Sequence, residues 1–222
     1  MNHRRVVVTG MGAVTPLAHR LPETWRRILL GHSGVRAVEG FDTTEYACKI
    51  WADVRDFCVE NYIQSKDARK MDPFTQYGMV AADEALRDAG LIHGEQALVD
   101  VALSCRAGVA VGAGIGGIQT ITHNQDRLVS GGARRVSPFF VPAGIINMVA
   151  GQISIRHGLK GPNISIVTAC ATGTHNIGLA ARMIKYGDAD LMVCGGAEMT
   201  TNPLCLAGFA SARALSKRND AP

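Results

Sequence analysis

Cys170 combines a nucleophilic side chain with a position where the backbone is expected to turn from a strand into a helix. The preceding residues, 163 to 168, are apolar and β-branched and follow Gly161-Pro162, which predicts a buried strand. Residues 172 to 186 favour a helix that ends at Gly187. Free N–H groups and the helix dipole favour negative charge at such a helix start, and the thiolate is the reactive form of cysteine. Cys170 is therefore our candidate nucleophile.

Small residues surround this cysteine. Ala169, Ala171 and Gly173 suit a crowded turn that a substrate must approach closely. The arrangement is analogous to the nucleophile elbow of hydrolases, where a sharp turn lifts the attacking atom clear of the sheet. The alternative is a buried structural cysteine, which is the commoner fate of a free thiol. The local residues leave both interpretations open.

Apolar runs alternate with helical patterns along the chain. Besides residues 163–168, we expect buried strands at residues 5–9 and 107–111 and a further strand at 190–194. We expect helices after Pro22, from Pro73 to about Ala89, from residue 118 to 129, and as one largely buried helix from Pro142 to about His157. This alternation predicts an α/β fold with a mainly parallel sheet covered by helices on both sides.

A glycine-rich turn, Gly112-x-Gly114-x-x-Gly117, follows the strand expected at 107–111 and matches the dinucleotide-binding fingerprint. That fingerprint is completed by an acidic residue about 20 residues further on. This region instead holds Arg134 and Arg135, which could serve the 2′-phosphate of NADP. The alternative, which we favour, is a tight turn with close backbone packing, because the fingerprint alone is weak evidence.

The histidine and cysteine pattern indicates no metal site. His175 is expected to be packed or structural, because five residues along a helix it would not face the sulfur of Cys170. The cysteines show neither a CxxC pair nor regular spacing, which argues against both zinc and a disulfide framework. They are Cys48, Cys58, Cys105, Cys170, Cys194 and Cys205. Scattered reduced thiols fit a cytoplasmic protein.

Composition and charge narrow the choice of partners. The 222 residues are 47% hydrophobic, which suffices for one large domain or two small ones. A net charge of +4 does not suggest general nucleic-acid binding. No Asp or Glu lies between Asp126 and Asp188, whereas Lys and Arg do, so a basic face for an acidic partner is one interpretation and a solvated surface the other. We expect no membrane association, because the chain has no signal-like start and no apolar run that could span a bilayer.

Several segments together resemble one family. Residues 168 to 178, Thr-Ala-Cys-Ala-Thr-Gly-Thr-His-Asn-Ile-Gly, resemble the nucleophile motif of β-ketoacyl-acyl-carrier-protein synthases. The match is closest to the elongating synthase II type of dissociated fatty-acid synthesis. Further matching segments are Val6–Gly12, Val136–Pro142, Asn147–Gly151, Gly187–Asp190, Gly195–Glu198 and Ala212–Ser216.

The resemblance implies a thiolase-like layered fold, of which this chain would form one βα half with insertions. It also implies a reaction without metal or cofactor, in which Cys170 takes an acyl group from acyl carrier protein and the N–H of Cys170 helps to hold the oxyanion. In such enzymes Ile115 and Phe140 lie by the acyl pocket, with Ile115 reaching toward the second subunit of a homodimer. The positions that would meet the acidic carrier protein are Lys66, Arg69, Lys70, Arg134, Arg135 and Arg213.

The chain departs from the family in length. Family members are about twice as long, and their second half carries two catalytic histidines, a lysine and a glycine-rich loop with a Phe. The seven histidines here do not sit in those motifs. We therefore expect residues 1–222 to be the N-terminal part of a synthase domain whose C-terminal half is absent, able to hold the nucleophile but unable to complete condensation. The alternatives are a non-catalytic module for carrier binding or dimerisation, and an NADP-binding oxidoreductase.

Overall fold

The computed structural model describes residues 4–93, 96–97 and 100–222. The chain forms two compact units. The first unit comprises Met1–Gly12 and Val59–Met199, and the second comprises Ala13–Cys58 and Thr200–Pro222. Cys170 and every other expected site residue except Arg213 belong to the first unit.

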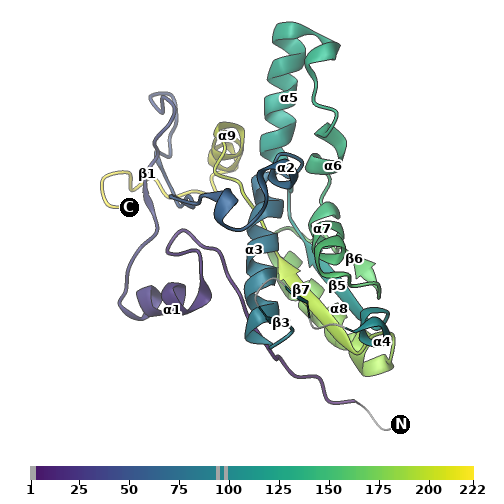
Figure 1. Ribbon diagram of the computed structural model, residues 1–222. Coiled ribbons are helices and arrows are strands. Elements are labelled where there is room, and N and C mark those ends of the chain that lie inside the picture. The colour runs from purple at the N-terminus through teal and green to yellow at the C-terminus, as the bar shows by residue number, and fades with distance from the viewer. Residues whose placement is uncertain (1–3, 94–95, 98–99) are drawn as a thin grey trace. The chain divides into compact units, whose positions relative to one another are not determined.

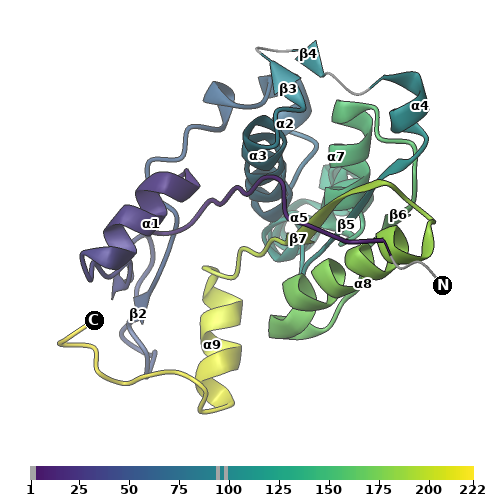
Figure 2. The same cartoon turned by 90° about the horizontal axis from the view of Figure 1, so that it is seen from below.

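A three-stranded parallel sheet forms the centre of the first unit. Strand β5 (Ala107–Gly112) lies between β6 (Asn163–Ile164) and β7 (Leu191–Gly196), and all six of its residues are buried. Helices α3 (Pro73–Asp88) and α7 (Met148–His157) lie on one side of this sheet, and α8 (Thr172–Tyr186) lies on the other (Figures 1 and 2). This is the covered parallel sheet that the alternating pattern predicted.

Further helices and one strand pair complete the first unit. Its other helices are η1 (Val59–Asn61), α2 (Ser65–Ala68), α4 (Val101–Ser104), α5 (Ile118–Gly131), η2 (Ala133–Arg135), α6 (Phe140–Gly144) and η3 (Ala169–Ala171). A small antiparallel pair joins β3 (Ile92–His93) to β4 (Gln96–Ala97). The largest fully buried apolar side chains among the described residues are Phe74, Met79, Val109, Val149, Ile153 and Leu159.

Local signals placed two long helices correctly. Pro73 occupies the first turn of α3, and the Asp72 side chain accepts a hydrogen bond from the Phe74 N–H, as expected for a helix start. Helix α8 ends at Gly187, whose φ of 90° lies in the left-handed region that glycine adopts without strain. These ends were predictable because a cap depends on residues only a few positions apart.

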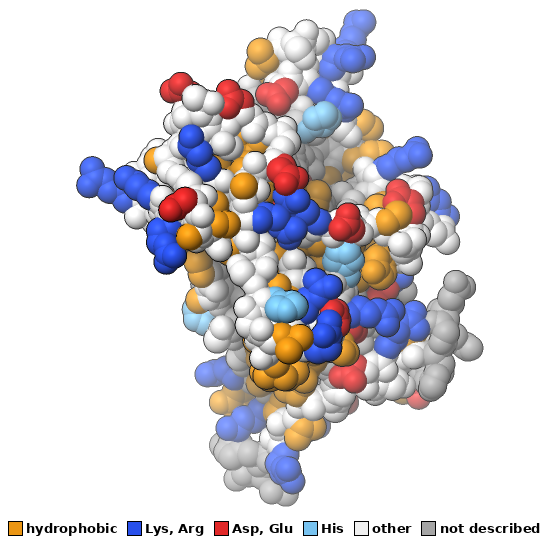
Figure 3. All heavy atoms as spheres, turned by 90° about the vertical axis from the view of Figure 1, so that its left-hand side faces the viewer, with side chains coloured by type: hydrophobic (Ala, Val, Ile, Leu, Met, Phe, Trp, Pro, Cys, Tyr) orange, Lys and Arg blue, Asp and Glu red, His pale blue; other side chains and the backbone are white. Residues whose placement is uncertain are grey.

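The second unit is smaller. It contains α1 (Leu21–Leu29), the antiparallel pair β1 (Arg36–Ala37) and β2 (Ile50–Trp51), and α9 (Pro203–Ser211). The Asn219 side chain accepts a hydrogen bond from the Lys49 N–H at 2.8 Å, which ties the last residues to the β1–β2 pair. Helix α1 was expected from Pro22, but its apolar residues Trp25 and Leu29 remain exposed. The face in Figure 3 likewise carries hydrophobic side chains between the charged ones.

The strand expected at residues 5–9 is wrong. These residues have no regular secondary structure, and Val7 and Val8 are 63% and 76% exposed. The segment instead leads into a close backbone contact with α3, where a Cβ at Gly12 would lie 2.1 Å from the carbonyl oxygen of Ala81. An apolar, β-branched run predicts a strand only where a neighbouring strand can pair with it.

Two further expectations need correction. The helix expected from Pro142 to His157 is broken into α6 and α7 around Ile145, which is 43% exposed. The strand expected at 163–168 is neither long nor buried: only β6 pairs with β5, and the segment is half-buried to exposed because it lies at the sheet edge.

In the described part of the chain, no helix is both long and apolar enough to cross a bilayer.

Candidate functional site

Cys170 is the middle residue of η3, two residues before the first residue of α8. Its thiol is free and the residue is exposed, so the interpretation as a buried structural cysteine is wrong. Ala169 has a φ of 50°, a left-handed conformation that is strained for a residue with a Cβ. The backbone therefore makes the sharp turn that the small residues around Cys170 predicted.

Thr168 anchors this turn through three groups. Its carbonyl accepts from the Ala171 N–H at 3.1 Å, and its N–H donates to the Thr172 hydroxyl at 2.8 Å. Its own hydroxyl lies 2.7 Å from Nδ1 of His175. His175 is exposed rather than packed. Its contact with the Thr168 hydroxyl gives it a structural role in the turn. Cys170 is the second residue of η3, and the first N–H groups of a helix lack acceptors within that helix.

The Asn176 side chain makes the hydrogen bonds to Ile166 that a neighbouring strand would otherwise make. This side chain is completely buried, and it both donates to the carbonyl and accepts from the N–H of Ile166, each at 3.1 Å. Its amide also donates to the Thr172 carbonyl at 2.9 Å. The Asn176 amide thus links α8 to the edge segment at Ile166. This segment leads into the Cys170 turn. Sequence reasoning missed this residue, because a single Asn in a helical pattern does not reveal its partner.

Asn176→Ala is expected to destabilise the chain by about 2–4 kcal/mol, since it leaves the N–H and C=O of Ile166 without their partners. Urea unfolding followed by circular dichroism measures the change. Thr174→Ala, at an exposed position of the same helix, serves as the control and should change stability by less than about 0.5 kcal/mol. Equal stabilities of the two variants would contradict the pairing role.

A carboxylate occupies the glycine-rich turn. The N–H groups of Gly114 and Ile115 donate to Oε2 of Glu198 at 2.7 and 2.8 Å, and the N–H of Gly116 donates to Oε1 at 3.0 Å. These are the donors that a dinucleotide pyrophosphate would need. The turn is therefore structural, as favoured above, and the NADP interpretation loses its binding groups. Glu198 was missed as a site residue, and only its place in the segment Gly195–Glu198 pointed to it.

The glycine-rich turn lies against the Cys170 turn. A Cβ built on Gly114 would lie 2.9 Å from Oε2 of Glu198 and 3.3 Å from Cα of Ala169, both tighter than an ordinary contact, so the two turns pack closely here. On its other side the turn contacts α6, where the Gly117 N–H donates to the Gly144 carbonyl at 3.2 Å. The structure thus places Ile115, which is 38% exposed, near the candidate nucleophile. Phe140 is the half-buried first residue of the adjacent α6.

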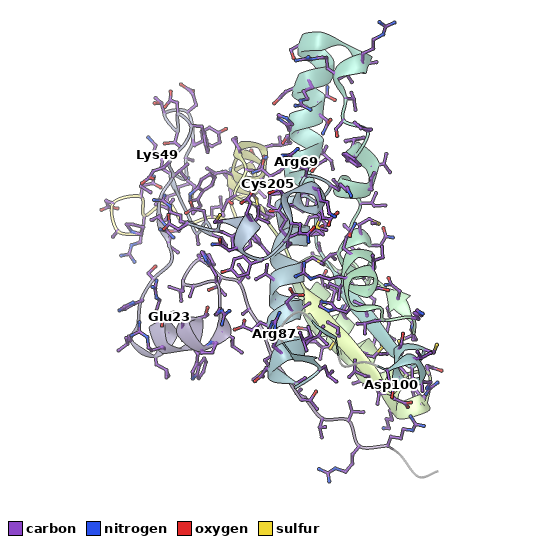
Figure 4. The ribbon with its side chains drawn as sticks, viewed as in Figure 1. Glu23, Lys49, Arg69, Arg87, Asp100 and Cys205 are labelled. Carbon is purple, nitrogen blue, oxygen red and sulfur yellow. The ribbon has the colours of Figure 1, made fainter. Side chains whose placement is uncertain are left out.

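The basic residues expected to meet a carrier protein fall into two groups in the first unit. Arg69 lies at the end of α2, beside α3 (Figure 4), and Lys70 pairs with Asp67 at 3.0 Å. The exposed members are Lys66, Arg69, Arg134 and Arg135. Arg213 is exposed and belongs to the second unit.

Helix α5 connects these two groups. Asp72, just after the first group, accepts a hydrogen bond from the Thr120 N–H in the first turn of α5 at 2.7 Å. The second group, Arg134 and Arg135, follows the end of α5 in η2. With 14 residues and 1.5 Å per residue, α5 separates the two groups by about 21 Å.

Within residues 4–93, 96–97 and 100–222, no three His, Cys, Asp or Glu side chains gather into a metal site.

Comparison with known proteins decides the family. Residues 3–221 match the family model described as "Beta-ketoacyl synthase, N-terminal domain". The chain belongs to the β-ketoacyl synthase family. It is 52% identical over 222 residues to 3-oxoacyl-[acyl-carrier-protein] synthase 2 of Vibrio cholerae serotype O1, and 44% identical over 218 residues to the protein of that name from Staphylococcus aureus strain COL. The chain spans about half the length of these relatives, 52% and 51% respectively.

Solved β-ketoacyl synthase structures share this fold. A β-ketoacyl synthase from Burkholderia phymatum STM815 matches 99% of the chain, at 30% identity and a TM-score of 0.85, with 52% of its own chain covered. A ketosynthase solved in complex with the acyl carrier protein of a type II polyketide synthase matches 96% of the chain, at 27% identity and a TM-score of 0.79, with 56% of its own chain covered. These matches confirm the thiolase-like α/β fold class.

Proposed function

We propose that residues 1–222 form the N-terminal part of a condensing acyltransferase of fatty-acid elongation, a β-ketoacyl-acyl-carrier-protein synthase. The observation that carries the proposal is the exposed thiol of Cys170 on a strained turn at the start of α8. The match to the N-terminal domain of the family and the identity to 3-oxoacyl-[acyl-carrier-protein] synthase 2 support it. The remaining half of the relatives' length would complete the active site.

The reaction would proceed in two transfers. The Cys170 thiolate attacks the thioester carbonyl of an acyl carrier protein, the carrier thiol leaves, and an acyl thioester forms on the cysteine. The Cys170 N–H donates to the oxyanion that develops in this step. Malonyl carrier protein then loses CO₂, and its carbanion attacks the acyl-cysteine carbonyl. The Cys170 thiolate leaves, and the β-ketoacyl product is longer by two carbons.

Acyl carrier protein, in its acyl and malonyl forms, is the proposed partner. The exposed basic groups at the two ends of α5 provide a surface about 21 Å long for an acidic protein. The neighbour solved in complex with its acyl carrier protein supports this partner. A homodimer in which Ile115 approaches the second subunit belongs to the same proposal. Six free cysteines fit a cytoplasmic location.

Reversing the charge of Arg134 and Arg135 to Glu is expected to weaken carrier-protein binding by about tenfold or more, because close charge pairs at an interface contribute strongly to affinity. The dependence of the dissociation constant on salt should become shallower in the same variant. Titration of labelled carrier protein at two salt concentrations measures both effects. The control carries the same charge change at the exposed residues Lys160 and Lys185. Equal affinity of the two double variants would contradict the proposed surface.

Covalent loading tests the function directly. The chain, extended to the length of its relatives, is mixed with an acyl-carrier-protein thioester, and intact mass and peptide mapping locate the acyl group. The proposal expects one acyl group on Cys170. No acylation, with carrier binding retained, would favour the non-catalytic module that binds carrier protein.

A further inference from the structure

We propose that Glu198 is a positioning residue that fixes the glycine-rich turn and, through that turn, the conformation of the backbone at Cys170. The proposal assigns a role to a residue that belongs neither to the expected nucleophile and acyl pocket nor to the expected carrier surface. Its catalytic consequence rests on the function proposed above, whereas its structural consequence can be measured independently.

The carboxylate supplies what the turn itself lacks. Three of the four residues Gly114 to Gly117 are glycines, and Gly116 has a φ of 81°, so the local sequence constrains this backbone weakly. Glu198 accepts from three successive N–H groups of the turn at 2.7–3.0 Å. Hydrogen bonds to an ionised acceptor are about twice as strong as neutral ones. Since Glu198 follows the end of β7 by two residues, the central sheet determines its position.

The fixed turn supports the strained residue next to the nucleophile. The site where a Gly114 Cβ would lie is 3.3 Å from Cα and 3.4 Å from the carbonyl carbon of Ala169. Ala169, at a φ of 50°, keeps this conformation only where its surroundings hold it. A displaced Gly114 would leave room for Ala169 to relax toward a negative φ, which would reorient the thiol and the N–H of Cys170.

A second carboxylate holds the other end of the same segment. Asp72 is 1% exposed, and its Oδ2 accepts from the Thr120 N–H at 2.7 Å. Burial raises the pKa of the Asp72 carboxyl, and the hydrogen bond from Thr120 opposes that rise. The segment between Gly114 and Thr120, which includes Ile115, is therefore held by Glu198 at its start and by Asp72 at its end. Asp72 belongs to the packed start of α3, whereas Glu198 is exposed, so Glu198 is the member whose substitution should disturb the core less.

Hydrogen exchange of the intact chain tests the structural consequence. In Glu198→Gln the exchange of the Gly114, Ile115 and Gly116 amides should accelerate by at least about tenfold, because their acceptor is weakened. The amides of β5, all of them in buried residues, should keep their protection. Glu23→Gln in α1 (Figure 4) is the matched control: its carboxylate pairs with Arg26 and Arg27, and the substitution should leave all of these amides unchanged.

Acyl loading of Cys170 in the extended chain tests the catalytic consequence. Glu198→Gln should lower the maximal loading rate by roughly ten- to hundredfold, and Glu198→Ala further, because small misplacements of reacting groups are costly. The KM for the acyl carrier protein should change less than about threefold, since the basic residues are untouched. A loss of folding would instead remove the protection of β5, which the exchange experiment detects.

The outcomes separate this inference from the function on which it rests. Unchanged exchange at Gly114–Gly116, or a loading rate of Glu198→Gln equal to that of the unsubstituted protein, would overturn the role of Glu198 while leaving the synthase function intact. Absence of loading in the unsubstituted protein would contradict the function itself. Faster exchange at the three amides together with slower loading supports the inference.

Discussion

Replacing Cys170 with serine is expected to lower acyl loading by at least about a thousandfold, because the attacking thiolate is lost and a hydroxyl at neutral pH is a far weaker nucleophile. The two side chains differ by one atom, so the turn and the start of α8 should keep their geometry. The measurement is the rate at which a labelled acyl group moves from acyl carrier protein to the chain extended to the length of its relatives.

Cys105→Ser provides the matched control. Cys105 is a second exposed, free thiol of the same unit, but it caps the short helix α4 rather than preceding a long one. Its substitution should leave loading unchanged within about twofold. Loading that persists in Cys170→Ser and disappears in Cys105→Ser would reassign the nucleophile, and loading that persists in both would contradict the assignment of Cys170.

Gly112→Ala is expected to affect both stability and loading, although it adds a single methyl group. A Cβ at this last residue of β5 would lie 2.3 Å from the carbonyl oxygen of Ile166 and 3.0 Å from both Nδ2 of Asn176 and Cγ2 of Thr172. The first contact is with backbone, so the edge segment must move away. We expect a loss of about 1–3 kcal/mol in the free energy of unfolding.

The same displacement reaches the nucleophile. Ile166 lies four residues before Cys170, and Asn176 and Thr172 are the side chains that connect this segment to α8. Acyl loading by Gly112→Ala should therefore fall by roughly tenfold or more even at temperatures where the variant is folded. Urea unfolding and the loading assay together measure the two effects.

Gly151→Ala makes the same change in a helix where it fits. The added Cβ would lie 3.6 Å from Sδ of Met148, an ordinary contact, and alanine favours the interior of α7. This variant should be as stable as the unsubstituted chain or more stable, by up to about 1 kcal/mol, with normal loading. If Gly112→Ala behaved like Gly151→Ala, the close approach of β5 to the Cys170 turn would not matter for function.

The sequence predictions that proved correct depend on residues close to one another along the chain. Asp72 and Pro73 set the start of α3, and Gly187 sets the end of α8, through contacts within a few residues. The buried strand at 107–111 was predictable because an uninterrupted apolar run between turn signals has few other places in an α/β fold. The turn at Cys170 followed from the same local logic.

The errors and omissions concern contacts between residues that are far apart along the chain. Residues 5–9 have strand-like composition but pair with no strand, and nothing local to them encodes that outcome. Glu198 lies more than 80 residues from the amides it accepts from, and Asn176 pairs with a segment before its own helix. Arg134, Arg135 and the residues near Lys66 were grouped by family resemblance alone, and their separation by α5 required coordinates.

By itself, the sequence determined the family, the α/β class, the position of Cys170 between an edge segment and a helix, and the ends of the main helices. These depend on residue type and on spacing along the chain, which a sequence states directly. Only the tertiary structure decided which segments meet. Glu198 accepts hydrogen bonds from the glycine-rich turn, Asn176 pairs with Ile166, and Gly114 packs against Ala169. Such contacts arise when segments far apart in the chain pack together, and their partners are selected by distance in space rather than by any local pattern.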